Sequence, residues 1–477
     1  MNGVAWFPPA NLGAVEWFFL AYFVLLHLGY LTLNILSLVH LRRYMDLHSL
    51  DRLPHAYAGF DPPISILVPA YNEAETIVAS VKSLLQLDYP DFEIVVINDG
   101  SQDDTLAELT NAFGLLPFPE DYWRRIPCKE IRGTFRSTRH ASLRVLDKAN
   151  GGKADALNAG INASRYPLFC AVDADSILQR DSLSRVVQPF VVDPLTIVAG
   201  GTVRIANGCR ISGGFLVEVG LPDKLLARIQ IVEYLRAFLF GRLGWSALNA
   251  VMIVSGAFGL FKKSEVIAAG GYRTDTVGED MELIVRLHRL HRTRGTPYRI
   301  AYVPDPICWT EAPETLKVLR HQRTRWQRGL IESLAMNRPL AMHPRSGWVG
   351  WFAFPFFVLF EVLGPAIEVV GYLTVVFGAA MGLFSWGAFG AFMLVALGFG
   401  VLLSVSAMLL EELSFRIYPK PSDVAKLCVA AVVENLGYRQ LAALWRLQGL
   451  LRWLTGGRQQ WGEMTRADTL RSGDKAR

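Results

Sequence analysis

The sequence predicts an α/β domain with a mostly parallel sheet, flanked by transmembrane α-helices. Apolar strand-like runs alternate with a helical pattern between residues 63 and 180, as in domains built from strand–helix–strand units. Three other stretches are apolar and long enough to cross a bilayer, which takes about 20 helical residues. The chain has 477 residues, and at roughly 150 residues per domain it holds two or three folding units.

The composition indicates that part of the chain does not face water. Hydrophobic residues make up 51% of the sequence and charged residues 19%, and the mean hydropathy is +0.26, whereas soluble domains carry about 25% charged residues. Disorder, collagen-like repeats and a small disulfide scaffold are therefore excluded. The five cysteines form no CxxC pair, so we expect neither a structural zinc site nor a disulfide framework. The net charge of +5 is too small to indicate a nucleic-acid partner.

The three apolar stretches, residues 15–39, 349–377 and 383–410, are predicted to cross the plasma (inner) membrane. The first is not expected to be a signal peptide, because no basic residue precedes it and it is too long. Basic residues follow the first and third stretches and precede the second, so the positive-inside rule places residues 40–348 and the C-terminus in the cytoplasm. The predicted domains are a helix (1–45), a cytoplasmic domain (46–345), two membrane helices (346–414) and a C-terminal region (415–477).

Charged residues occur within the apolar C-terminal half. Residues 424–454 are apolar at helical spacing but are interrupted by Glu434 and Arg439, so we expect an interfacial or re-entrant helix pair rather than a further span. Glu361 and Glu368 lie seven positions apart, on one face of the second predicted span. They either line a polar path or face a partner helix, and the sequence favours neither.

Polar residues follow each predicted strand where it ends. Residues 63–69, 92–98 and 168–172 are predicted strands, and residues 73–87 a helix. The strands are followed by Tyr71-Asn72-Glu73, Asp99-Gly100-Ser101 and Asp173-Ala174-Asp175. Ligands bind beyond the carboxyl ends of the strands in such sheets, so the sequence predicts a binding site at this edge.

Asp173 and Asp175 are candidate ligands for a hard divalent cation, Mg²⁺ or Mn²⁺, which would in turn hold phosphate oxygens. A basic segment lies just upstream, with nine Lys or Arg residues and two acids between residues 124 and 153. It ends on Gly151-Gly152-Lys153, where the glycines allow close backbone approach and the lysine suits a phosphate. A solvated basic loop explains residues 124–148 equally well.

Two later clusters complete the candidate chemistry. Glu279 and Asp280 open a predicted helix, and an acid near a cation–phosphate site can serve as a general base toward a hydroxyl; simple N-capping is the alternative. The motif QRTRW at 322–326 lies in a basic run, where arginines suit a diphosphate and the tryptophan offers a stacking surface for a sugar ring. For Lys317 and Arg320, binding to anionic lipid is the alternative.

Six motifs in this order resemble the membrane-embedded family 2 glycosyltransferases, which include hyaluronan, chitin, bacterial cellulose and poly-N-acetylglucosamine synthases. The motifs are PAYNE (69–73), NDGS (98–101), GGKADALN (151–158), DAD (173–175), GED (278–280) and QRTRW (322–326). The resemblance covers roughly residues 62–330 and the flanking spans. It implies a nucleotide-sugar-binding domain of the glycosyltransferase A type.

The resemblance also implies a role for individual residues. Asp99 would contact the uridine of a UDP-sugar, together with Tyr71 and Glu73. Asp280 would deprotonate the acceptor hydroxyl, which then attacks the anomeric carbon in a single inverting displacement. The other implied donor contacts are Lys153, Asp155, Asp173, Gln322, Arg323 and Arg325, with Asp173 and Asp175 on the cation. The implied acceptor contacts are Trp326, Glu279 and Gly256.

The sequence departs from the family pattern at a few points. Gly278 stands where the family often has threonine, and Asn98 where aspartate is frequent. Related synthases usually carry more membrane helices than the three predicted here. Either the helices of 424–454 complete a channel, or the chain oligomerises, or the product does not cross through this protein.

The leading hypothesis is a processive UDP-sugar polymerase that makes a β-linked polysaccharide and feeds it outward, alone or with an export partner. The alternative is a non-processive transferase that adds one sugar to a lipid carrier or glycolipid. A non-catalytic scaffold is disfavoured, because Asp173, Asp175, Asp280 and Arg325 are all intact. A nucleic-acid-binding role is disfavoured because the basic segment lacks interleaved aromatic stacking platforms.

Overall fold

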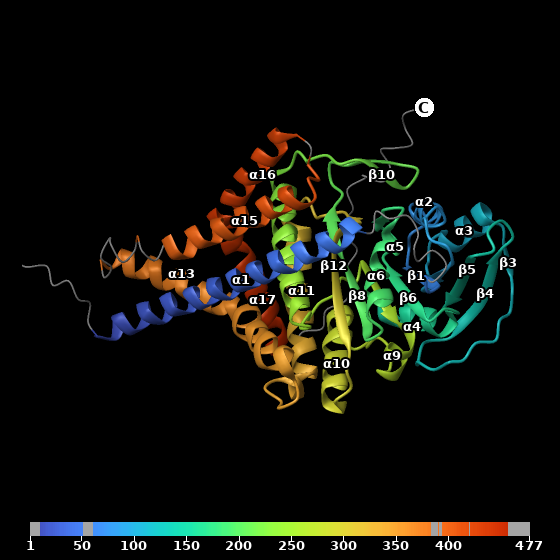
Figure 1. The fold of residues 1–477 in the computed structure, drawn as a ribbon, viewed down its shortest axis with the longest axis horizontal. Helices are drawn as coiled ribbons and strands as arrows, with labels where there is room; N and C mark the ends of the chain where they lie inside the picture. Colours follow the sequence, from blue (N-terminus) through green and yellow to red (C-terminus); the bar gives the residue numbers. More distant parts are fainter. Residues whose placement is uncertain (1–9, 51–60, 383–389, 391–393, 419, 457–477) are drawn as a thin grey trace, which may run out of the picture.

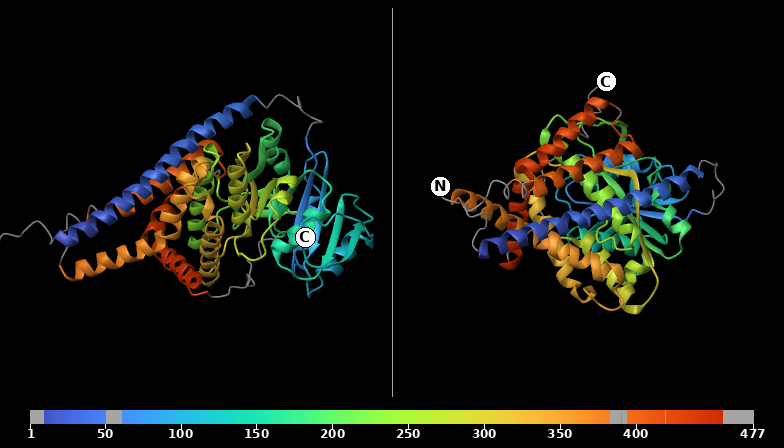
Figure 2. Two further views of the ribbon diagram at one scale, coloured as in Figure 1. Left: turned by 90° about the horizontal axis from the view of Figure 1, so that it is seen from below. Right: turned by 60° about the vertical axis from the view of Figure 1, so that its left-hand side comes forward.

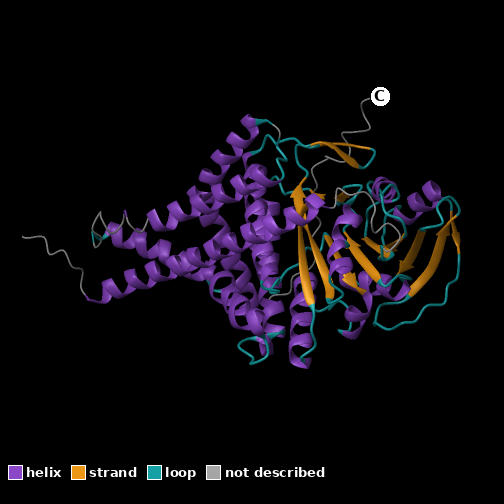
Figure 3. Cartoon of the chain, in the orientation of Figure 1, coloured by secondary structure: helices purple, strands orange, loops and turns teal. Residues whose placement is uncertain are grey.

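The structure, a computed structural model, describes residues 10–50, 61–382, 390, 394–418 and 420–456. An α/β domain occupies one side of the molecule and a group of helices the other (Figures 1 and 3). Figure 2 shows α1 (Ala10–Leu50) lying along the helical part and, like α13 (Gly364–Ala380), extending away from the sheet.

A ten-stranded mixed sheet forms the centre of the α/β domain, with the order β3-β4-β5-β2-β1-β6-β11-β8-β12-β7. Strands β5, β2, β1 and β6 are parallel, which confirms the parallel arrangement expected of residues 63–180. Strands β3, β4, β7 and β11 pair antiparallel with their neighbours, so the sheet is more mixed than expected. The strands are β1 (Ile64–Ala70), β2 (Phe92–Asn98), β3 (Leu115–Pro117), β4 (Ile131–Ser137), β5 (Leu143–Lys148), β6 (Leu168–Val172), β7 (Ile177–Leu178), β8 (Thr196–Ile205), β11 (Phe258–Lys262) and β12 (Arg299–Thr310), with a separate hairpin of β9 (Arg210–Ser212) and β10 (Phe215–Glu218).

Helix α4 carries two candidate site residues, Lys153 and Asp155, at the edge of the sheet. It packs against β1 and β2, and Ala154 to Ala163 are all buried. Small residues allow this close approach: a Cβ on Gly160 would lie 2.9 Å from Ile97 Cδ1. The helices of this domain are α2 (Ile77–Leu84), α3 (Thr105–Phe113), α4 (Lys153–Ala163), α5 (Ser182–Val186), α6 (Gln188–Val192), α9 (Lys263–Ala268), α10 (Glu279–Arg294) and α11 (Leu316–Met336).

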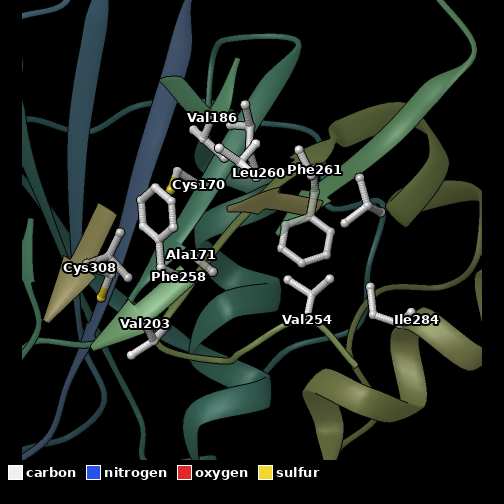
Figure 4. Close-up of a cluster of buried hydrophobic side chains, with 14 of the residues drawn as sticks. Cys170, Ala171, Val186, Val203, Val254, Phe258, Leu260, Phe261, Ile284 and Cys308 are labelled. Atoms are coloured by element: carbon white, nitrogen blue, oxygen red, sulfur yellow. The ribbon is translucent and has the colours of Figure 1, made fainter. Parts of the chain in front are cut away.

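The core lies around β6 and β11, where buried side chains from the strands meet those of the flanking helices (Figure 4). Phe169 and Phe261 stack with their ring centroids 5.2 Å apart. Cys170 and Cys308 are buried here as free thiols. Burial raises the pKa of both thiols well above the ordinary value, so they act as small apolar side chains.

Within the described part of the chain, one helix, α1, is long and apolar enough over Trp17–Met45 to cross a membrane, judged by length and composition. The second expected span, residues 349–377, is a pair of helical segments that together are long and apolar enough for one span but are bent by 43°. Pro365 has no N–H to donate and disfavours helical backbone in the residue before it, which accounts for the break. The third expected span, 383–410, lies partly outside the described residues.

The bend affects the two acidic residues of the second stretch. It separates Glu361 from Glu368, so they do not share one continuous helix face as expected. Glu361 accepts hydrogen bonds from Arg446 at 2.6 Å and from Tyr30, which belong to two other helices. The helical part consists of α1, α7 (Leu225–Tyr234), α8 (Leu243–Ala247), α12 (Phe354–Phe356), α13, α15 (Phe399–Ser414), α16 (Pro421–Val433) and α17 (Arg439–Leu454), with π-helical turns between several of them.

Residues 424–454 form a helix pair, α16 and α17, with non-helical backbone at Leu436 and Gly437 between them. Helix α17 packs against α11 and α13 rather than standing apart from the protein. Residues 457–477 of the predicted C-terminal region lie outside the described part of the chain.

A buried ion pair joins the helical part to the sheet. Arg204 of β8 and Glu411 of α15 lie 2.6 Å apart, and both side chains are about 5% exposed or less. Removing one partner of such a pair leaves an uncompensated buried charge, which costs about 3–5 kcal/mol, whereas replacing both partners by apolar residues is often neutral.

We therefore expect Glu411→Leu to lower the thermal unfolding midpoint markedly, and the double variant Arg204→Met/Glu411→Leu to recover most of that loss. Intrinsic fluorescence of the detergent-purified protein measures both. Glu218→Leu is the control, because Glu218 pairs with Arg210 at 3.5 Å on the surface. A midpoint for Glu411→Leu no lower than that of the control contradicts the prediction.

Candidate active site

The loops after β1 and β2 are joined by hydrogen bonds at the carboxyl edge of the sheet. The Asn72 amide donates to Ser101 Oγ at 3.0 Å, and the Gln102 amide donates to Asn72 Oδ1 at 2.8 Å. Asn72 has a φ of 56°, a left-handed conformation that asparagine tolerates. This loop leaves Tyr71 46% exposed at the edge, whereas Glu73 is partly buried.

Asp99 is buried at the end of β2 and is held by the loop before α4. Its carboxylate accepts hydrogen bonds from the Gly151 amide at 3.0 Å and the Gly152 amide at 2.7 Å. Lys148 pairs with Asp99 and, at 2.6 Å, with Asp155. Burial raises the pKa of Asp99, and the hydrogen bond and charge of Lys148 oppose this. Asp99 and Asp155, both predicted to contact the donor, thus share one buried lysine.

The sequence did not single out Lys148. The solvated-loop alternative for residues 124–148 is wrong for its second half, because β4 and β5 form there. Lys148 is fully buried, and Arg144 is 3% exposed and pairs with Glu93 at 2.7 Å. The available signal was the LRVL run before Lys148, which has the composition of a buried strand.

A second cluster gathers residues from four segments. Lys153, the first residue of α4, pairs with Asp173 at the end of β6 and donates to the Gly256 carbonyl oxygen at 3.1 Å. The Gly256 amide donates to Asp280 Oδ2 at 3.0 Å. A Cβ on Gly256 would lie 3.1 Å from Lys153 Nζ and 3.2 Å from Asp280 Oδ2, so glycine permits this contact. The structure therefore brings together four residues that the sequence predicted in a common site.

The charges of this cluster influence one another strongly. Burial alone would lower the pKa of Lys153, but Asp173, Glu279 and Asp280 outweigh burial and raise it. Burial raises the pKa of Glu279 to about 7, and the charge of Asp280 adds to the rise, while Lys153 and Arg325 oppose it. The cluster thus favours a charged lysine and a protonated Glu279.

Helix α11 supports the loop that precedes Glu279 and Asp280. Gly278 and Gly329 are in backbone contact: a Cβ on Gly278 would lie 2.7 Å from the Gly329 Cα. Glu332 accepts hydrogen bonds from Thr276 Oγ1 at 2.8 Å and from the Val277 amide at 3.1 Å. This contact explains why glycine stands at position 278. Glu332 has no motif around it, and the sequence did not indicate its role.

The two arginines of the QRTRW motif have different neighbours. Arg323 is buried, pairs with Glu233 of α7 at 2.7 Å and lies 4.6 Å from the centre of the Trp326 ring. Arg325 is partly buried and lies near enough to Glu279 to lower its pKa. Gln322 is buried, and Trp326 is 41% exposed. Of the two arginines, the structure brings Arg325 to the carboxylates and Arg323 to Glu233.

The residues at the end of β6 fit a divalent cation that takes few protein ligands. Among the described residues no group of three or more His, Cys, Asp or Glu side chains is placed to hold a metal ion. Mg²⁺ commonly uses one or two carboxylates and completes its shell with water and substrate phosphates. Asp173 and Asp175, both partly exposed at this edge, supply such a pair.

Family models and known proteins resemble this chain. "Glycosyl transferase family 2" matches residues 65–126 and "Glycosyltransferase like family 2" matches residues 128–329. A poly-beta-1,6-N-acetyl-D-glucosamine synthase of Staphylococcus epidermidis is 31% identical over 272 residues, which are 57% of this chain and 55% of the relative. One of Staphylococcus aureus (strain COL) is 33% identical over 290 residues, 60% of this chain and 59% of the relative. The matches thus span less than two thirds of the length of these curated relatives.

The solved structure of the mannosyltransferase PcManGT from Pyrobaculum calidifontis, in complex with GDP-Man and Mn²⁺, shares the fold. Its TM-score is 0.52 at 19% identity, over 89% of this chain and 99% of that one. The likeness shows an α/β domain of the glycosyltransferase A type. Two consecutive family models match residues 65–329, and the relatives named above are polysaccharide synthases. The chain therefore belongs to family 2 of the glycosyltransferases, in the group that resembles polysaccharide synthases.

Proposed function

We propose that this chain transfers a sugar from a UDP-sugar to a growing polysaccharide at the cytoplasmic face of a membrane, processively and coupled to export. The observation that carries the proposal is the meeting of Lys153, Asp173, Gly256 and Asp280 at the carboxyl edge of the sheet. A carboxylate oriented as a base lies there beside a lysine suited to a diphosphate. The names of the Staphylococcus relatives support a polysaccharide product and make UDP-N-acetylglucosamine the first donor to test.

Asp280 acts as the general base. Its Oδ2 accepts from the Gly256 amide at 3.0 Å and its Oδ1 from the Met281 amide at 2.8 Å, so the carboxylate has one orientation. The acceptor hydroxyl gives its proton to this carboxylate while its oxygen forms a bond to the anomeric carbon. The bond from that carbon to the diphosphate breaks at the same time, and UDP leaves with its electron pair. A single displacement of this kind inverts the anomeric configuration.

Lys153 and Arg325 stabilise the charge that develops on the leaving diphosphate. Lys153 is charged because three carboxylates raise its pKa above the ordinary value. Asp173 and Asp175 would hold a divalent cation, Mg²⁺ or Mn²⁺, whose charge offsets that of the diphosphate. Gln322 and Arg323 extend the same basic helix, and a diphosphate contact by Arg323 would compete with its ion pair to Glu233.

The two ends of the site bind the two substrates. Asp99 faces the uridine from the end of β2, oriented by Lys148 and the amides of Gly151 and Gly152. Tyr71, Glu73 and Asp155 complete this side. On the acceptor side the half-exposed ring of Trp326 stacks on a sugar, and Gly256 and Glu279 line the approach to Asp280.

Glu279 is buried beside Asp280, and its pKa is raised to about 7. Two adjacent carboxyl groups cannot both ionise without repulsion, and burial makes Glu279 the one that stays neutral. Asp280 is more exposed, and its carboxylate accepts two backbone hydrogen bonds. Burial and the charge of Asp280 thus make Glu279 the member of the pair that favours the neutral form.

The membrane placement rests on exposed apolar side chains. On α13, Val370, Leu373 and Val376 are more than half exposed, as are Trp17 and Phe18 at the far end of α1. Exposed apolar surfaces of this size mark membrane or protein contacts. We place these ends in the hydrocarbon layer, with several passes and the α/β domain on the cytoplasmic side. A homo-oligomer or an export partner would complete a path for the product.

We expect the detergent-purified protein to release UDP from UDP-N-acetylglucosamine with Mg²⁺ or Mn²⁺ and to form a high-mass product on a sizing gel. Asp280→Asn should lower this rate by about 10²–10⁴-fold while UDP binding is retained, because a general base contributes that much. A coupled UDP-release assay measures the rate, and equilibrium binding measures the affinity for UDP.

Asp275→Asn is the matched control, since Asp275 is an exposed residue of the same loop that pairs with Arg273. Equal losses in both variants would overturn the assignment of the base. A single-sugar lipid product would indicate the non-processive transferase, and failure to bind UDP would overturn the proposed donor class.

The raised pKa of Glu279 makes stability depend on pH. Because the folded protein holds this proton up to about pH 7 and the unfolded chain loses it near pH 4.5, stability falls as the pH rises between these values. We expect the thermal midpoint to fall from pH 5 to pH 8, and to fall less in Glu279→Gln. Identical pH profiles for the two proteins would contradict the protonated state.

A further inference from the structure

A cavity of about 780 Å³ lies at the edge of the sheet opposite the transfer site. It is bounded by residues that precede β6, by the carboxyl end of α4 and by the carboxyl end of β11, which runs antiparallel to β6. Asp173 lies at the other end of β6. The cavity is thus separate from the carboxylate cluster, and its volume is in the range of small-molecule binding sites.

Basic residues dominate the charge of this cavity. Its lining contains Arg125, Arg136, Arg144, Arg165, Lys262 and Lys263, against the acids Glu120 and Asp121. Glu120 pairs with three of the arginines, including Arg144 at 2.5 Å and Arg165 at 2.6 Å. Arg144 also pairs with Glu93 at 2.7 Å, so two carboxylates pair with three guanidinium groups, and Arg125 and Lys262 add further positive charge. A concave wall with this excess attracts anions.

Two buried donors in this lining lack an acceptor. The Nε–H groups of Arg136 and Arg144 are buried and have no hydrogen-bond partner among the described residues. Arg144 is only 3% exposed. A buried donor left without an acceptor costs free energy. Arginines with free donors are well suited to phosphate oxygens.

Aromatic side chains lie beside these arginines. Trp123 is 81% exposed and Phe118 is 43% exposed, and Tyr122 also lines the cavity. The Arg136 guanidinium lies 3.8 Å from the centre of the Phe118 ring, and Arg125 lies 5.9 Å from that of Trp123. Exposed rings next to guanidinium groups offer stacking surfaces for a flat ring. A neutral sugar chain would not match the positive charge of the lining. A bare inorganic anion would not match its aromatic rings.

We propose that this cavity is a second binding site, which takes a nucleotide: a flat base on the aromatic side chains and phosphates on the arginines. The site stands apart from the proposed sugar transfer and does not depend on it. Arg125, Lys262 and Trp123 are the residues to change, because they are at least partly exposed and no ion pair of the described residues involves them.

Equilibrium dialysis of radiolabelled ATP and GTP tests this, with the full-length protein in detergent and saturating UDP present to occupy the donor site. We expect saturable binding of at least one of the two nucleotides. Arg125→Glu/Lys262→Glu should weaken it by about tenfold or more, since charge-assisted hydrogen bonds to phosphate are lost. Trp123→Ala should weaken it as well, through loss of stacking.

Arg210→Glu, on the exposed β9–β10 hairpin, is the control for a charge reversal elsewhere on the surface and should bind as the unchanged protein does. Thermal unfolding shows whether each variant is folded. No saturable binding, or equal weakening by Arg210→Glu, would overturn the proposal. Displacement by tripolyphosphate as effective as that by unlabelled nucleotide would overturn the recognition of a ring.

Discussion

The positive charge of Lys153 allows three carboxylates to lie together at the carboxyl edge of the sheet. Asp173 pairs with this lysine directly, and Glu279 and Asp280 are close enough to raise its pKa. Like charges at such short range repel one another unless a cation lies among them. The same lysine donates to the Gly256 carbonyl, and the Gly256 amide in turn orients Asp280. The position of the base thus depends on the first residue of α4.

A second buried lysine, Lys148, holds two carboxylates together on the donor side of the site. Lys148 lies between Asp99 and Asp155, so the end of β2 and the first turn of α4 are held by one charge. The Gly151 and Gly152 amides donate to the same Asp99 carboxylate. The short segment from Gly151 to Asp155 therefore joins the two halves of the site, which is why close packing of α4 against β1 and β2 matters for both.

Helix α11 connects the site to the apolar helices. One side of it contacts the loop before α10 through Gly329 and Glu332. Another side contacts α17, where Arg446 donates to Gln327 Oε1 at 2.8 Å. Arg446 also pairs with Glu361 in the bent helical segment. Helix α11 thus contacts both the loop that precedes Glu279 and Asp280 and the helices of the apolar part.

The parallel core and the polar residues at its edge follow from local sequence. Runs such as FEIVVIN predict strands through local composition, and parallel strands end at one edge, so the gathering of Asp99, Lys153 and Asp173 at that edge could be expected. Which charges pair depends instead on the packing of distant segments. Lys148 meets Asp99 across 49 positions, Arg204 meets Glu411 across 207, and Arg323 meets Glu233 across 90. Such pairings depend on how segments far apart in the sequence pack together, so a local sequence pattern does not predict them.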